Sequence, residues 1–296
     1  MKEYLSNFSA ASFWNIPNIE TVLDYSIDTS KVNFTVSKQS ARFKKKDKII
    51  HLCELELPAN AVVLKNGIIV AAPELVFLQL ACSLDIHRLI LLGLQLCSHP
   101  PGKPSDAITT KQKLKAFLAE TPGHRGHRKA LRAVKYIEDG SASVMESIAY
   151  MILTLPHALG GYGIDGAVFN YEIKLKNEGV KRLGQKRCFL DLYYKQARLA
   201  IEYDSFAFHN NPTEQGKDAV RSAILERQNI EVMHLNTIQV YDKNACKDFV
   251  NNLATRLKKR KQNRAKNFDK MHAQLRTLLP AGKPVVETNE VGVLVK

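Results

Sequence analysis

The sequence lacks a long uninterrupted apolar run. Its most apolar stretch, residues 61–82, is broken by Lys65, Glu74 and two amide side chains, whereas a membrane-spanning helix needs about 18 or more apolar residues in succession. The first residues carry Lys2 and Glu3 but no apolar core of the kind that a signal peptide has. The pattern therefore predicts no transmembrane helix, and we expect a cytoplasmic protein rather than an exported one.

Closely spaced cysteine pairs are also absent. The chain has 5 cysteines, an odd number, and no Cys-x-x-Cys motif, which argues against a zinc ribbon, a redox centre or a disulfide framework. We expect reduced thiols that lie mostly in the core.

Acidic residues are scarce relative to basic ones. In 296 residues, 43 Lys and Arg stand against 29 Asp and Glu, which gives a net charge of +14. The apolar share of 45% is ordinary for a globular protein and excludes a disordered or fibrous chain. Such a basic balance favours a polyanionic partner, nucleic acid first, although charge alone does not establish binding.

The length predicts about two domains at ~150 residues each. Residues 99–105 contain three prolines and a glycine, which disfavour a helix and mark a boundary. The pair Asn66-Gly67 between two apolar runs predicts a β-hairpin. We expect four segments: an N-terminal α+β domain (1–105), a basic helical connector (106–140), an α/β domain (141–260) and a basic C-terminal tail (261–296).

The order of elements after residue 140 predicts an α/β fold. Ser143 opens an apolar helix that ends before Pro156, and a turn is expected at residues 177–179. Three strands are expected at 168–176, 187–194 and 198–204. A helix at 214–228, a strand at 230–235 and a last helix at 244–260 are expected after them. This order is typical of a mixed sheet with helices packed on it.

Three acidic residues are expected on one face of a hairpin. If Tyr194 pairs with Leu199, strict alternation places Asp191 opposite Glu202 and Phe189 opposite Asp204. The opposite face is then apolar, with Leu190, Leu192, Tyr194, Leu199, Ile201 and Tyr203.

Opposed acids about 5 Å apart repel each other unless a cation or a proton lies between them. Mg²⁺ takes carboxylate oxygens and keeps several waters, so two acids and a substrate phosphate suit it. A nearby basic side chain such as Arg198 would neutralise the pair equally well. From spacing alone, the metal site and the ordinary ion pair remain open alternatives.

An ordered set of residues resembles a bacterial nuclease-like domain. The set comprises Glu146 on a helix, FLD ending at Asp191, LAIEYDS over 199–205, His209, and Asp218-x-x-Arg221 before the next strand. It resembles the domain related to very-short-patch-repair endonucleases, in the PD-(D/E)xK or restriction-endonuclease-like superfamily. The resemblance covers about residues 141–259. Residues 1–140 are similar, more weakly, to the region upstream of this domain in abortive-infection antitoxin-like relatives.

The sequence departs from the pattern of this family at three positions. Phe189-Leu190 replaces the proline that commonly precedes the first acid, and Ser205 replaces a glycine. Asp204 occupies the place of the superfamily lysine, so the role of that lysine is unassigned.

The resemblance implies a metal-dependent nuclease whose fold is a mixed sheet flanked by helices. It implies that Mg²⁺, or Mn²⁺, is held by Asp191, Glu202 and Asp204, with Glu146 approaching from the first helix. His209 would move a proton and Arg221 would bind phosphate oxygens. The expected activity is a DNA endonuclease in repair, mobile-element biology or phage defence, with RNA as a lesser alternative.

Each of these residues also has an ordinary structural interpretation. Glu146 stands three residues after Ser143, which is the spacing of a capping box. Asp218 and Arg221 are spaced as an ion pair on a helix, and His209 lies in an expected loop.

Two basic segments are candidates for phosphate contacts. Alternatively they are solvated surface, and the protein is then a non-catalytic DNA-binding regulator or antitoxin that keeps the nuclease-like domain as a scaffold. The candidate contacts are Arg125, Arg128 and Lys129 in one segment and Lys258 and Lys259 in the other.

Overall fold

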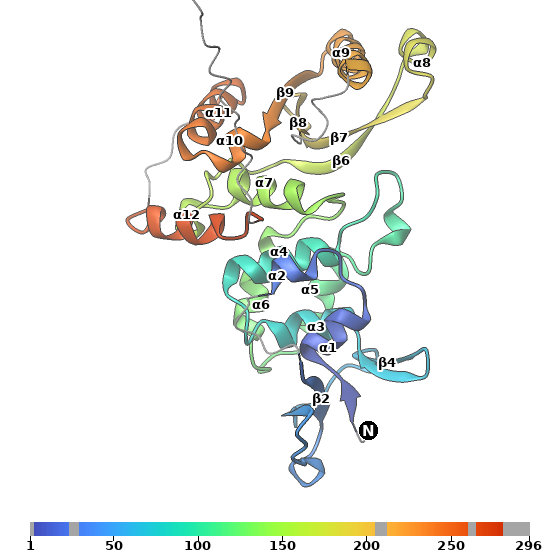
Figure 1. Cartoon of the computed structure of the whole chain (residues 1–296), viewed down its shortest axis with the longest axis vertical. Helices are drawn as coiled ribbons and strands as arrows, with labels where there is room; N and C mark the ends of the chain where they lie inside the picture. Colours follow the sequence, from blue (N-terminus) through green and yellow to red (C-terminus); the bar gives the residue numbers. More distant parts are fainter. Residues whose placement is uncertain (1–2, 24–29, 205–211, 260–264, 281–296) are drawn as a thin grey trace, which may run out of the picture.

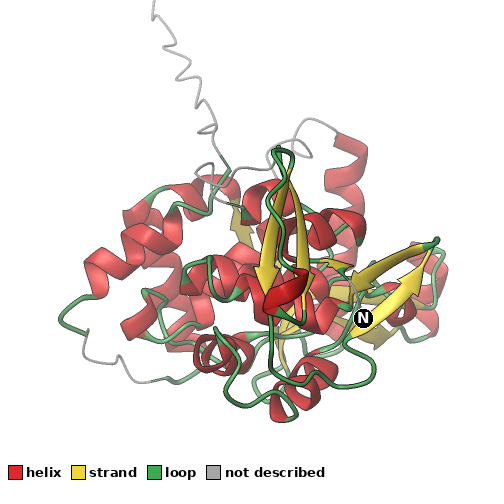
Figure 2. Ribbon diagram, turned by 90° about the horizontal axis from the view of Figure 1, so that it is seen from below, coloured by secondary structure: helices red, strands yellow, loops and turns green. Residues whose placement is uncertain are grey.

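The computed structural model describes residues 3–23, 30–204, 212–259 and 265–280 and has a mixed α/β fold with two mixed sheets. Figure 1 shows the N-terminal sheet at one end of the long axis and the second sheet toward the other. The strands of the N-terminal sheet project from a helical body (Figure 2). The prediction of an α/β protein is confirmed at this level.

The N-terminal sheet has five strands in the order β3-β2-β1-β5-β4, with parallel and antiparallel neighbours. Asn66 (φ 51°) and Gly67 (φ 75°) form the two-residue turn between β4 and β5, and this confirms the predicted hairpin. The strands are β1 (Tyr4–Leu5), β2 (Val32–Val36), β3 (Lys48–Leu52), β4 (Val62–Lys65) and β5 (Ile68–Ala71).

Helices make up the centre of the molecule. The apolar run over residues 74–96 predicts one helical segment, but Asp85 accepts hydrogen bonds from the backbone N–H groups of His87 and Arg88 and begins a new helix there, so the segment forms two helices. The helices are α1 (Asn7–Phe13), α2 (Ile19–Val22), α3 (Pro73–Leu80), α4 (Ile86–Leu96), α5 (Lys111–Ala119), α6 (His127–Ala133) and α7 (Val144–Thr154). Short 3₁₀ turns lie at Gln39–Ala41, Pro104–Asp106, Val134–Tyr136 and His157–Leu159.

The second sheet has four strands in the order β6-β7-β8-β9, of which β8 and β9 are parallel and the others antiparallel. Figure 1 shows α8 and α9 on the side of this sheet away from α7. The elements are β6 (Val168–Lys174), α8 (Asn177–Leu183), β7 (Arg187–Tyr194), β8 (Leu199–Asp204), α9 (Pro212–Arg227), β9 (Glu231–Asn236), α10 (Thr237–Tyr241), α11 (Lys243–Arg256) and α12 (Phe268–Arg276).

Two predictions of secondary structure in this half were wrong. The expected turn at 177–179 is the start of α8, because Val180 and Leu183 bury apolar surface against the sheet and thereby stabilise a helix. The helix α10 was missed, and a capping box formed by Asn236 and Gln239 begins it. The predicted strands and the order of the remaining elements agree with the structure.

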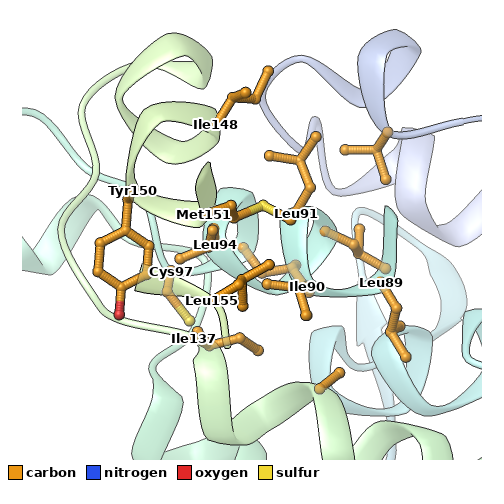
Figure 3. Close-up of a cluster of buried hydrophobic side chains, with 14 of the residues drawn as sticks. Leu89, Ile90, Leu91, Leu94, Cys97, Ile137, Ile148, Tyr150, Met151 and Leu155 are labelled. Carbon is orange, nitrogen blue, oxygen red and sulfur yellow. The ribbon is translucent and has the colours of Figure 1, made fainter. Parts of the chain in front are cut away.

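One large apolar cluster runs through both halves of the chain. It includes Tyr4 in β1 and Leu278 beyond α12, and the inward faces of α4 and α7 meet within it. Figure 3 shows Ile148 and Met151 of α7 beside Leu91 and Leu94 of α4. A second, smaller cluster lies between α8, α9 and the other face of the second sheet.

None of the described helices combines the length with the apolar character that crossing a bilayer requires.

Candidate functional site

The predicted acidic residues lie on three neighbouring elements. Glu146 is in the first turn of α7, Asp191 is in β7, and Glu202 and Asp204 are in the second half of β8. β7 and β8 are adjacent in the sheet, and α7 contacts β7. The fold therefore brings these segments together from positions up to 58 residues apart in the sequence.

Glu146 is buried, with 8% of its surface exposed. Its Oε2 accepts hydrogen bonds from the backbone N–H of Ala142 (3.0 Å) and from Nδ2 of Asn170 (3.0 Å). Ser143 caps the helix by accepting from the N–H of Glu146 (3.1 Å). Half of the expected capping box is present, because the Glu146 carboxylate binds Ala142 and not the cap residue itself.

A chain of buried polar side chains holds the start of α7. Nδ2 of Asn18 donates to Oε1 of Gln95 (3.0 Å), and Nε2 of Gln95 donates to Oγ of Ser147 (2.9 Å). Ser147 in turn donates to Oγ of Ser141 (2.8 Å), and Ser141 lies two residues before Ser143, the cap residue of α7. The helix that carries Glu146 is thus fixed to the N-terminal half by hydrogen bonds as well as by packing.

Burial and the nearby carboxylate of Asp191 raise the pKa of Glu146 to about 7. The hydrogen bonds from Ala142, Ser143 and Asn170 oppose this rise but do not cancel it. Glu146 consequently exchanges its proton close to neutral pH, which is unusual for a carboxyl group and common at functional sites.

Asp191 interrupts the pairing of β7 with β8. Backbone pairs run from Tyr194–Leu199 to Leu192–Ile201, as predicted, and there they stop. The side chain of Asp191 then accepts the backbone N–H of Tyr203 (2.9 Å). The expected pairs of Asp191 with Glu202, of Leu190 with Tyr203 and of Phe189 with Asp204 are not formed, because a carboxylate takes the place of a backbone partner.

The predicted apolar face was wrong at Leu190. This residue packs in the smaller cluster with Cys188, Tyr193 and Ala200, whereas Leu192 packs in the large one. Asn170 lies across from this point, between the pairs Phe169–Leu192 and Tyr171–Leu190, and has φ 42°. Strict alternation fails here: β6 leaves regular extended geometry at Asn170, and Leu190 and Leu192 of β7 pack in different clusters although they are two residues apart.

Burial raises the pKa of Asp191 above its usual range. The hydrogen bond from Tyr203 and the guanidinium of Arg221 lower this pKa, and the carboxylate of Asp204 raises it further. Charged side chains of α7, β8 and α9 therefore all affect the pKa of Asp191.

Glu202 is buried, with 7% of its surface exposed, and forms an ion pair with Arg221 of α9 (Oε1 to Nη2, 3.0 Å). The same Nη2 donates to the backbone oxygen of Phe189. Nε of Arg221 is buried and has no hydrogen-bond partner among the residues that the structure describes. Nη2 thus links α9 to β7 and β8, and the N–H of Nε is a donor without a partner among the described residues.

Asp204 contacts a residue that sequence reasoning did not assign to the site. Its Oδ2 lies 3.0 Å from Nδ1 of His234 in β9. β9 runs parallel to β8, with His234 level with Glu202. The parallel register could not be read from the sequence, so only the acids on the hairpin were identified.

Asn170 is the second residue of the site that the sequence did not reveal. It donates to Glu146 and to the backbone oxygen of Gly140 (2.9 Å) from a left-handed conformation that asparagine tolerates better than most residues. No spacing or motif in the sequence pointed to it.

Other predicted contributors lie elsewhere or outside the described part. His209 is not among the described residues. Arg198 donates to the backbone oxygens of Asn229 (2.8 Å) and Gln228 (2.5 Å), and these contacts turn it away from the role of neutralising the acids. Within the described ranges, no three His, Cys, Asp or Glu side chains are grouped closely enough to hold a metal ion by themselves.

The predicted basic contacts are divided between two regions. Arg125 and Arg128 are exposed before and in α6, and Nζ of Lys129 donates to the backbone oxygen of Leu84 (2.8 Å). Lys258 is exposed beyond α11, and Lys259 donates to the backbone oxygen of Asp165 (2.6 Å) and pairs with its carboxylate. Arg221, the remaining predicted contact, lies among the acids.

Replacing Glu146 with glutamine is expected to stabilise the protein at alkaline pH. Its folded-state pKa, about 7, lies above the ordinary 4.5, so wild-type stability falls as pH rises through this window. At ~1.4 kcal/mol per pKa unit, Glu146→Gln should gain about 3 to 4 kcal/mol in the free energy of unfolding at pH 8 and almost nothing at pH 4.5.

Urea unfolding at both pH values measures this difference. Glu120→Gln, at an exposed position after α5, is the matched control and should change little at either pH. A glutamine at position 146 that destabilised the protein equally at both pH values would contradict the prediction.

No known family model matches this sequence, and neither the curated proteins nor the solved structures include a match.

Proposed function

We propose that the protein is a metal-dependent endonuclease that hydrolyses phosphodiester bonds, with DNA as its substrate. The observation that carries the proposal is the meeting of Asp191 and Glu202 at one guanidinium, that of Arg221, with Glu146 close to Asp191. Buried carboxylates are costly unless a positive charge compensates them. One arginine leaves this group net negative, which favours a further cation.

The donor set suits Mg²⁺ without a complete ring of protein ligands. Mg²⁺ commonly binds through one or two carboxylates and takes its other oxygens from water and substrate phosphates. Asp191 and Glu202 would hold it, with Asp204 close by. When bound, the ion would neutralise the phosphate, activate water for attack and stabilise the leaving oxygen.

The protein side chains would divide the remaining work. Arg221, whose side chain is 26% exposed, can donate from its guanidinium to a phosphate oxygen. Glu146, whose pKa is about 7, can accept a proton near neutral pH, and Asn170 fixes the direction of its carboxylate. The order of α7, three strands, α9 and β9 supports the restriction-endonuclease-like fold that the sequence resembles.

A second candidate is a non-catalytic DNA-binding regulator or antitoxin. The ion pair between Glu202 and Arg221 favours it, because this carboxylate already has a positive partner. In that case the acids would stabilise the fold, and a divalent ion would change nothing.

A cleavage assay separates the two candidates. Wild-type protein is incubated with duplex DNA, single-stranded DNA and RNA in Mg²⁺, Mn²⁺ or EDTA. We expect DNA cleavage that depends on the metal and is lost in Glu202→Gln. Glu172→Gln is the matched control, since Glu172 also pairs with an arginine on the same sheet (3.2 Å), and it should cleave normally.

Two results would overturn the nuclease proposal. One is intact nucleic acid in every condition, with DNA binding that is independent of metal and unaffected by Glu202→Gln. The other is equal loss of cleavage in both variants, which would place the effect in the stability of the sheet.

A further inference from the structure

A second charged surface lies on the N-terminal sheet, at a place that no sequence motif singled out. The segment between β2 and β3 contains Arg42 and three consecutive lysines, Lys44 to Lys46, and Lys48 opens β3. These side chains, with Lys31 and Phe43, line a hollow of about 810 Å³. Figure 1 places β2 at the opposite end of the molecule from β7, β8 and α9.

Few acids oppose this charge. Lys45 lies 3.9 Å from Asp47, and Lys48 lies 3.7 Å from Glu3. Within the described part of the chain, Lys44 and Lys46 form no ion pair, and both are exposed. Positive charges this close together raise the local positive potential and attract a polyanion whose charges extend over the same length.

The charged surface continues toward α6. A neighbouring hollow of about 750 Å³ shares Arg42, Ile49 and Ile50 with the first and is also lined by His51 and Arg125. Burial lowers the pKa of His51, and Arg42 and Arg125 lower it further, so both guanidinium groups lie close to this ring. Arg125, which the sequence predicted as a phosphate contact together with Arg128 and Lys129, therefore also borders this basic surface.

An exposed aromatic ring stands among these cations. Phe43 is 42% exposed and lies 5.7 Å from Nζ of Lys48. A single exposed apolar side chain is ordinary on a protein surface, so the position of this ring among cations, and not its exposure, is the informative observation. A ring flanked by cations is suited to contact a sugar or a base while the lysines bind phosphates.

We propose that Arg42, Lys44, Lys45, Lys46, Lys48 and Arg125, the basic loop surface, bind the phosphate backbone of a nucleic acid at a site separate from the acidic cluster. The inference extends the proposed function, because it gives the substrate a second point of attachment. Backbone contacts of this kind fix position without reading sequence.

The shape of the surface favours nucleic acid over an anionic membrane. The cations line two joined hollows, and a convex phosphate backbone fits a concave surface. A bilayer is nearly flat on this scale and would contact only the rim. Anionic vesicles are therefore a competing ligand in the test.

The test measures binding to a labelled DNA duplex by fluorescence anisotropy in EDTA, where no cleavage takes place. The variant combines Lys44→Gln, Lys45→Gln and Lys46→Gln. We expect its affinity to fall about 10- to 100-fold at ~0.1 M salt, and the slope of log K against log salt to become shallower by about 2 to 3. Far-ultraviolet circular dichroism and thermal unfolding check that the variant is folded.

The matched control combines Lys243→Gln, Lys247→Gln and Lys270→Gln, which remove the same charge from exposed positions on α11 and α12. Its affinity should stay within about twofold of wild type. An equal loss in both triple variants would overturn the proposal, since net charge alone would then explain binding. A lysine 44–46 variant that loses binding to phosphatidylserine vesicles but keeps DNA affinity would also overturn it.

The outcome is independent of catalysis. If wild type binds DNA, the lysine 44–46 variant loses that affinity and wild type never cleaves DNA, the basic loop surface stands and the nuclease proposal fails. If cleavage depends on Glu202 while the lysine 44–46 variant binds DNA as wild type does, the acidic site stands and the basic loop surface fails.

Discussion

Asp191→Asn is expected to lower the rate of Mg²⁺-dependent DNA cleavage by about a thousandfold and to raise the melting temperature of the protein. A metal ligand at the reacting phosphate contributes several kcal/mol to transition-state stabilisation, and each ~1.4 kcal/mol is a factor of ten in rate. The asparagine oxygen can still accept the N–H of Tyr203, so the end of the ladder between β7 and β8 should survive.

The rise in stability follows from the sign of the pKa shift. Burial raises the pKa of Asp191, so the folded state holds this proton more tightly than the unfolded state does. Wild type therefore loses stability as pH rises through that pKa, and the neutral asparagine does not. The gain should be present at pH 8 and should disappear in acid.

Two measurements, cleavage kinetics and thermal unfolding at pH 8, check the prediction together. Asp248→Asn on α11 is exposed and serves as the matched control, with no change expected in either quantity. A functional carboxylate gives opposite signs for activity and stability when it is neutralised. A structural one would lose both, and that result would count against the proposed role of Asp191.

Gly160→Ala is expected to destabilise the protein by about 3 to 5 kcal/mol. Gly160 has φ 78°, which costs an alanine about 1 to 2 kcal/mol. A Cβ there would lie 2.4 Å from the backbone nitrogen of His272 and the carbonyl carbon of Met271 in α12, and backbone atoms cannot move aside cheaply. The close approach also allows His272 Nδ1 to donate to the Gly160 oxygen (2.7 Å).

Gly184→Ala isolates the contribution of packing. Gly184 has a similar φ of 68°, but nothing lies within 4 Å of its would-be Cβ. Its alanine variant should lose only about 1 kcal/mol, as measured by urea unfolding. Equal losses in the two variants would show that α12 does not pack against residues 157–160 as described.

Local signals in the sequence predicted the elements of the fold well. The Asn66-Gly67 turn and the strand over 187–194 agree with the structure, because turn chemistry and alternation depend on near neighbours. The turn predicted at 177–179 failed because an asparagine and a glycine two residues apart are also compatible with a helix once tertiary packing stabilises it.

The candidate site was predictable only in part. Asp191 and Glu202 lie near Arg221, Glu146 lies near Asp191, and the resemblance in the sequence placed all four in one domain. Contacts made across strands were not predictable, since those of Asn170 and of His234 with Asp204 depend on register and on a local break in alternation. The basic loop surface was missed for a related reason, as its cations lie in a segment without a periodic pattern.

The shared core around α7 has a practical consequence for dissecting this protein. A fragment beginning near residue 141 would retain every acid of the candidate site, yet it would leave Ile148 and Met151 facing water where α4 had covered them. Ser147 would also lose the hydrogen bond that it accepts from Gln95. The exposed apolar surface would make such a fragment prone to aggregate. A lack of activity in it would therefore not test the role of the acids in cleavage.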